Sequence, residues 1–164
     1  MKPSRIVAAI GAFTLLTAVA LWGGSGTRQA GAPVFSGGAY LTIIKDAGGY
    51  FASRSVITLH ADHTMMAVDS AEQGPTYYFS GQLGGWKPVG SHRLLGRMIN
   101  FQYPMNSSGP GIARADYVIN LSSDRRHVSG TITVVAFPLQ EIDPFGEGGT
   151  LITTTSFEGE RIDP

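Results

Sequence analysis

Residues 56–69 contain two runs rich in β-branched and apolar residues, separated by the short polar sequence Ala61-Asp-His-Thr64. Runs of this composition on either side of a tight turn are typical of a β-hairpin. Similar pairs of runs recur from about residue 39 to the C-terminus, and nothing after residue 30 has the 3.6-residue period of a helix. The sequence therefore predicts an all-β protein.

The expected strands follow one another along the chain with turn or loop sequences between them. They cover residues 39–45, 50–60, 65–69, 76–80, the region of Trp86, and residues 93–103, 112–121, 127–137 and 150–162. Consecutive hairpins favour a meander, and closing the sheet removes its exposed edges. We therefore expect a single antiparallel meander barrel of about eight strands.

Alternation along residues 112–121 supports a barrel with one apolar and one polar face. Tyr117 and Ile119 fall on one side of this strand, whereas Arg114, Asp116 and Asn120 fall on the other. A sheet that packs against a core on one face and meets water on the other has this pattern.

The N-terminus has the composition of an export signal. Lys2 and Arg5 precede an uncharged apolar stretch at residues 6–22, and Ala18-Val-Ala20 offers small residues at a cleavage spacing. The stretch is slightly long for a cleaved signal and slightly short for a membrane span, so an uncleaved anchor is an alternative. We expect residues 1–30 to be a signal peptide or N-terminal anchor, residues 31–38 a linker and residues 39–164 the barrel, in an exported protein that is secreted or lies in the periplasm or cell envelope.

Charge and cysteine content exclude several classes of function. Setting aside Lys2, Arg5 and Arg28 reduces the 12 basic residues to 9, against 12 acidic residues, for a net charge of −3. No basic stripe remains for a phosphate backbone, so we expect no nucleic-acid partner. The absence of cysteine excludes disulfides, thiol catalysis and thiolate metal sites. Contact with a membrane is expected only through the N-terminal segment, if it is not cleaved.

Three short motifs carry a resemblance to a known family. They are Leu59-His-Ala-Asp-His-Thr64, Gly84-Gly-Trp-Lys87 and Phe157-Glu-Gly-Glu-Arg-Ile162. Across residues 38–162 the chain resembles exported bacterial proteins that are similar to lipocalin-like, or calycin, β-barrels. The resemblance implies a small apolar ligand in the barrel mouth. The turn in such sequences usually has Asp-Gly, whereas this chain has Asp62-His63, where a positive φ is less favourable.

Aromatic residues and one arginine are the candidate ligand-binding residues. Arg97 lies on the otherwise apolar face formed by residues 95, 97, 99, 101 and 103. If that face points inward, the guanidinium needs a carboxylate or a ligand anion. The opposite face, with Met98, Asn100 and Gln102, is also partly apolar, so the two orientations could be exchanged. The ligand-binding prediction comprises Tyr40, Tyr78, Arg97, Tyr103 and Tyr117, which would give a cavity its walls and a few polar groups.

No catalytic residue, metal site or cofactor is predicted. The sequence spacing of His60 and His63 suggests a two-histidine metal site. However, residues three apart on a strand point to opposite faces, and no third ligand is placed beside them. The serine-nucleophile motif and the phosphate-binding loop are both absent.

Three functions remain. The first is an exported barrel that binds a small apolar ligand in its interior or mouth, and the second is a barrel cyclase or isomerase that shapes a polyene- or polyketide-like substrate. The third is a structural or interaction barrel filled by its own side chains, because an eight-stranded barrel can be just full. An enzyme is the less favoured of these interpretations.

Overall fold

The computed structural model describes residues 35–72, 77–104 and 110–163. Contacts divide the chain into Met1–Gly31 and Ala32–Pro164, and all described residues belong to the second unit. The expected signal or anchor at residues 1–30 and the first half of the linker at 31–38 lie outside the described residues and stay predictions. Within the described ranges, no helix is long and apolar enough to cross a membrane.

The all-β prediction is confirmed. Every regular element of the described chain is a strand: β1 (Gly37–Lys45), β2 (Phe51–His60), β3 (Thr64–Asp69), β4 (Tyr77–Phe79), β5 (Gln82–Pro88), β6 (Arg93–Pro104), β7 (Gly111–Leu121), β8 (His127–Pro138) and β9 (Thr150–Arg161). The region of Trp86, expected to be one of the strands, is β5.

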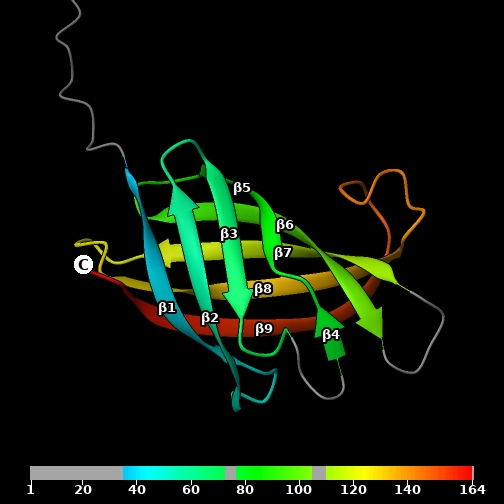
Figure 1. Ribbon diagram of the computed structural model, residues 1–164. Coiled ribbons are helices and arrows are strands. Elements are labelled where there is room, and N and C mark those ends of the chain that lie inside the picture. Colours follow the sequence, from blue (N-terminus) through cyan, green and yellow to red (C-terminus); the bar gives the residue numbers. More distant parts are fainter. Residues whose placement is uncertain (1–34, 73–76, 105–109, 164) are drawn as a thin grey trace, which may run out of the picture. The chain divides into compact units, whose positions relative to one another are not determined.

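The sheet closes into an antiparallel barrel of eight strands with meander topology. Neighbours around the barrel are β1, β2, β3, β5, β6, β7, β8 and β9, and β9 pairs again with β1. In Figure 1, β1, β2 and β3 cross β6, β7, β8 and β9 at a steep angle, so the two halves of the sheet face each other across the core. The closure leaves neither the first nor the last of these strands as a free edge.

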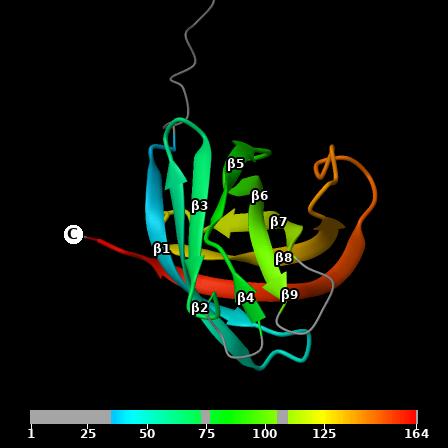
Figure 2. The same cartoon turned by 45° about the vertical axis from the view of Figure 1, so that its right-hand side comes forward.

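The short strand β4 continues β5 along the same edge of β6. β5 pairs with β6 from Leu94 to Ile99, and β4 pairs with it from Gln102 to Pro104. Ser80 and Gly81 separate β4 from β5, so the strand that borders β6 on this side is interrupted. Figure 2 shows β4 beside the arrowhead end of β6.

Large apolar side chains fill one half of the interior. Alternate residues of all eight strands point inward, and the core formed by their side chains is continuous. Its largest fully buried apolar members are Tyr40, Leu59, Met65, Met98 and Ile119. Burying such side chains contributes about 1.5–3 kcal/mol each, which makes this half of the barrel the main source of its stability.

Two glycines allow strands to approach more closely than any other residue would. A Cβ at Gly84 would lie 2.0 Å from the carbonyl oxygen of Arg97, and one at Gly130 would lie 1.8 Å from that of Val118. Gly130 also makes room for the ring of Phe157, which lies 2.9 Å from the same Cβ position. The contacts with the carbonyl oxygens of Arg97 and Val118 are with backbone atoms of the adjoining strand, so they cannot be relieved by turning a side chain.

Candidate functional site

One end of the barrel is closed by aromatic packing. Trp86 is 5% exposed, and its indole nitrogen donates a hydrogen bond of 3.0 Å to the carbonyl oxygen of His60. The rings of His63 and Phe35 lie 4.5 and 5.4 Å from the Trp86 ring. His63 has a φ of +70°, the strained turn conformation expected where Asp-Gly is usual. This end therefore has a structural role.

The opposite end of the interior is polar. Its inward-facing side chains come from β2, β3, β5 and β6 at the alternate positions that carry apolar residues in the other half. We call this set the polar end; it comprises Ser53, Ser55, Asp69, Gln82, Asn100 and Gln102. Ser53, Ser55, Asn100 and Gln102 are each at most 9% exposed. Polar groups at such depth need hydrogen-bond partners or a function.

Small side chains accompany the polar ones. Ala67, Ala113 and Ala115 are buried in this half of the interior. Val134 and Thr155, on the inward faces of β8 and β9, are partly exposed. We call the part of the polar end beside these partly exposed positions the mouth of the barrel.

Hydroxyl groups at the polar end donate to acceptors within the protein. The Ser53 hydroxyl donates to a carboxylate oxygen of Asp69 at 3.0 Å, and the Ser55 hydroxyl donates to the carbonyl oxygen of Val68 at 3.0 Å. The hydroxyl of fully buried Thr42 donates to the carbonyl oxygen of Ser55 at 2.9 Å. These bonds fix the side chains of β1, β2 and β3 around the mouth.

Asp69 and Tyr117 interact electrostatically across this end. Burial raises the pKa of the Asp69 carboxyl, and hydrogen bonds from the Ala71 amide and the Ser53 hydroxyl offset part of that effect. Burial also raises the pKa of Tyr117, and the negative charge of Asp69 raises it further. The Tyr117 hydroxyl donates to the Gln82 side-chain oxygen at 2.8 Å. The local field is therefore negative, with Tyr117 held as a neutral hydroxyl.

Asn100 is the exception to the pattern of satisfied groups. It is 8% exposed, and its side-chain oxygen Oδ1 is buried without a hydrogen-bond partner. Its cross-strand neighbour on β7 is Ala113, whose side chain has no polar atom. An unpartnered buried acceptor costs about 1–3 kcal/mol of folding free energy, so its retention calls for an explanation.

The structure does not bring the five residues of the ligand-binding prediction together. Tyr117 reaches the polar end, but Tyr40 is buried towards the closed end, where its hydroxyl donates to the carbonyl oxygen of Arg125 at 3.1 Å. Tyr78 and Tyr103 form an edge-to-face pair 6.0 Å apart and are 44% and 45% exposed. A ligand role for these tyrosines stays a prediction.

Arg97 lies on the outer face of β6, which is the second of the two orientations considered from the sequence. Its side chain is 45% exposed and pairs with Asp116. Asp116 also accepts from Arg114 at 2.9 Å, and the side chain of Arg114 is only 10% exposed. The Arg114 guanidinium donates to the carbonyl oxygens of Pro144 and Gly146 at 2.9 and 2.6 Å. These two arginines hold the loop before β9 against the outside of the barrel.

A second small hydrophobic cluster lies beneath that loop. It consists of Ile99, Ile112, Val135 and Phe137, and the Arg114 guanidinium lies 5.3 Å from the centre of the Phe137 ring. Val135 and Phe137 also lie beside Gly149 at the end of the loop. The outer face of β6, β7 and β8 is consequently partly apolar, as the sequence pattern of residues 95–103 suggested.

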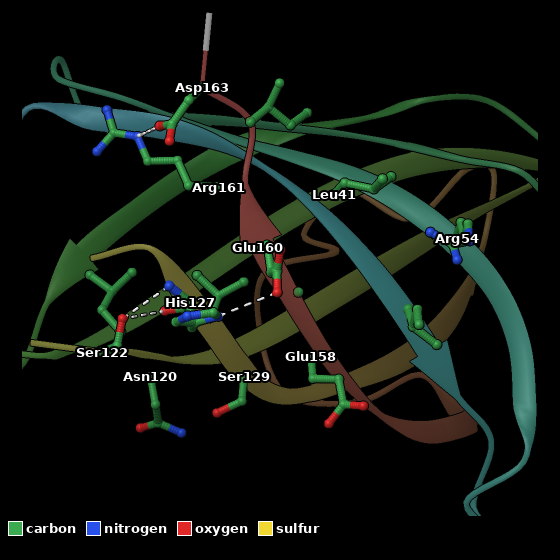
Figure 3. Close-up of a pocket in the computed structure, with 15 residues that line it drawn as sticks. Leu41, Arg54, Asn120, Ser122, His127, Ser129, Glu158, Glu160, Arg161 and Asp163 are labelled. Carbon is green, nitrogen blue, oxygen red and sulfur yellow. Dashed lines mark hydrogen bonds and ion pairs between the residues drawn. The ribbon is translucent and has the colours of Figure 1, made fainter. Parts of the chain in front are cut away.

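An external groove of about 900 Å³ follows β9 on the outside of the barrel. Figure 3 shows Glu158 and Glu160 of β9 and His127 and Ser129 of β8 around it. Of the carboxylates that line it, Glu158 lies 2.7 Å from Lys45, and Glu160 lies 3.9 Å from His127, which is a basic partner only when protonated. The groove lies on the outer face of the sheet, away from the buried polar groups of the interior.

In the described ranges, no three His, Asp or Glu side chains gather so that they could hold a metal ion. His60 is exposed at the end of β2, whereas His63 stacks on Trp86.

Comparison with protein-family models, with curated proteins and with solved structures finds no match for this chain. The geometry of the polar end is therefore the only evidence for the candidate site. Of its residues, only Tyr117 was predicted from the sequence as a ligand-binding candidate. Asp69, Gln82 and Asn100 were missed, and the signal that could have found them is the replacement of apolar by polar residues at the inward positions near the strand ends.

Proposed function

We propose that this protein is a small-molecule binding barrel whose ligand enters the mouth at the polar end. The observation that carries the proposal is the division of the interior. Large apolar side chains fill one half, whereas the other half is lined by polar and small side chains and contains an unpartnered buried acceptor. Binding sites of small molecules combine apolar walls with a few placed polar groups in this manner.

The expected ligand has an apolar part and a polar group. Ala113, Ala115 and Val134 offer apolar contacts, and Gln82 and Asn100 offer an amide donor and a carbonyl acceptor. The ligand is accordingly held at the mouth instead of passing through to the closed end, where Trp86 and its neighbours occupy the space.

Binding is tested by native mass spectrometry of the protein purified from its own host, together with thermal denaturation in the presence of a compound panel. We expect a co-purifying molecule of small mass, or a panel member that raises the unfolding temperature. Gln82→Leu should weaken such binding, and the external variant Ser129→Leu should not. Equal binding by both variants would place the ligand outside the polar end.

Asp69 favours one alternative, a barrel cyclase or isomerase. A partly buried carboxyl with a raised pKa, whose charge acts on a tyrosine hydroxyl, is the type of group that transfers protons in active sites. The two functions are distinguished by recovering the bound compound: an enzyme releases a rearranged product, and Asp69→Asn stops that conversion while keeping the binding. A binding protein returns the compound unchanged.

We also propose export, supported by Lys2 and Arg5 and by the uncharged stretch at residues 6–22. Intact-mass measurement of the protein recovered from medium and envelope fractions tests this. A mass that lacks about the first 20 residues indicates cleavage near Ala20. Full-length protein in the membrane fraction indicates an anchor, and full-length protein confined to the cytosol contradicts export.

A further inference from the structure

The hydrogen bonds that the polar end already makes limit which chemical groups of a ligand could pair with it. The hydroxyl donors of Ser53, Ser55 and Tyr117 are already directed at protein acceptors. The group left without a partner is an acceptor, Asn100 Oδ1. Asn100 Oδ1 could therefore accept a hydrogen bond from a donor on a ligand.

The charge at the polar end further limits the chemical class of ligand that could bind there. Asp69 is its ionisable acid, and its charge is felt as far as the Tyr117 hydroxyl. Among the described residues, the neighbouring guanidinium groups of Arg97 and Arg114 are on the outer face, paired with Asp116. An anionic ligand would therefore meet a carboxylate with no cation to balance it, which is unfavourable where solvent is partly excluded.

A cationic ligand would gain less binding free energy from Asp69 than the presence of a carboxylate suggests. Both oxygens of Asp69 already accept hydrogen bonds, one from the Ser53 hydroxyl and one from the Ala71 amide. Moving an ammonium group out of water costs more than moving a hydroxyl, and only a good ion pair offsets that cost. A neutral hydrogen-bond donor can pair with Asn100 Oδ1 without the cost of moving a charged group out of water.

We propose that the polar end selects uncharged molecules carrying a hydroxyl or N–H group, which donates to Asn100 Oδ1, and that it discriminates against carboxylates. The inference rests on the proposed binding function and specifies its ligand class. Gln82 is placed to assist, because its side-chain oxygen is held by Tyr117 while its amide nitrogen can donate to an oxygen of the same ligand.

A matched series of four aromatic probes tests the inference. Phenol is a neutral donor, anisole lacks the donor, benzoate is an anion and benzylamine is a cation. Each is titrated into isotope-labelled protein, and the NMR signals of the side-chain amides of Gln82 and Asn100 are followed. We expect phenol to bind about tenfold or more tightly than anisole and benzoate, as one unmatched buried hydrogen bond predicts.

Asn100→Leu should remove the preference for phenol over anisole, bringing the ratio of the two dissociation constants close to one. Asn100→Ala serves the same purpose if the leucine does not fit. Asn120→Leu, an exposed position on the outer face of β7, should keep the full preference. Variant titrations are followed at the Gln82 side chain, which is common to all three.

The outcomes separate the inference from the proposed function. Tighter binding of benzoate or benzylamine than of phenol, or an unchanged phenol preference in Asn100→Leu, overturns the ligand class while the binding function stands. If none of the four probes shifts the Gln82 and Asn100 signals, the polar end is not a binding site and both proposals fail.

Discussion

Replacing Arg114 with methionine should release the loop that precedes β9 and destabilise the barrel. The guanidinium makes hydrogen bonds to Asp116 and to the carbonyl oxygens of Pro144 and Gly146, at 2.6 to 2.9 Å. Hydrogen bonds of charged groups contribute about 1.5–3 kcal/mol each, but the carbonyls of this surface loop can bind water when the arginine is lost. Asp116 also keeps Arg97 as a partner. We therefore expect a loss of about 2–3 kcal/mol, less than the sum of the three bonds.

The assay is urea unfolding followed by tryptophan fluorescence, combined with limited proteolysis of residues 139–149. Methionine keeps an apolar stem over the Phe137 ring, so the measured loss reflects the charged group more than lost packing. Lys45→Met is the matched control, because the Lys45–Glu158 pair has side chains that are 34% and 60% exposed and should contribute less than about 1 kcal/mol. The reasoning is refuted if both variants lose the same stability, or if the loop is cut no faster in Arg114→Met.

Three further results are expected. Asn100→Leu should raise the free energy of unfolding by about 1–2 kcal/mol in the absence of ligand, because it removes an unpartnered buried acceptor; a loss in urea unfolding would show that Asn100 is satisfied in the free protein. Asp69→Asn should stabilise the protein at pH 7, because burial raises the pKa of Asp69 and so makes its charged form unfavourable in the folded state. The difference in free energy of unfolding from the wild type should disappear below the ordinary carboxyl pKa of 3.8, where Asp69 is protonated in both states. Urea unfolding of both proteins at pH 7 and at pH 3 checks this, and a free-energy difference that is the same at both pH values would contradict it. Gly130→Ala should cost about 2–4 kcal/mol because its Cβ would strike the Val118 carbonyl, whereas Gly81→Ala, with its nearest atoms at 3.7 Å, should cost less than about 1 kcal/mol, and equal thermal shifts would contradict the close approach.

The fold was predictable because the hairpin signals are local. The turn at residues 61–64, the alternation in residues 112–121 and the paired runs after them each specify a strand pair without reference to distant parts of the chain. Closure of β9 on β1 followed from the need to protect both edges. The main local feature left unspecified was that β4 and β5 would both pair with β6.

The orientation of β6 could not be predicted, because both of its faces are apolar. Met98 points into the core, whereas Ile99 packs outside against Ile112 and Phe137. The outer face is apolar at this point since the loop before β9 covers it. Alternation identifies an inner face only where the outer face meets water, so a loop folded back on the barrel removes the signal.

The polar end was missed for a related reason. Asn100 and Gln102 occupy inward positions, yet polar residues near the end of a strand ordinarily indicate solvent. Only the register with β7 and the burial of the side chains distinguish an inward polar residue from an outward one. Sequence patterns describe which residues alternate, but not which face encloses the interior.

The pairing of β9 with β1 also determines when the protein can fold. Lys45 and Glu158, which are joined across these two strands, lie 113 positions apart, whereas the other barrel neighbours are consecutive strands or, for β3 and β5, are separated only by the short strand β4. A chain that emerges from its N-terminus can form hairpins early, but it stays an open sheet with two unpaired edges until residues 150–161 are available. Closing so long a loop is slow compared with forming the hairpins. The last step of folding is therefore the docking of the final strand, and loss of residues 150–161 should yield an edge-exposed chain prone to association instead of a smaller barrel.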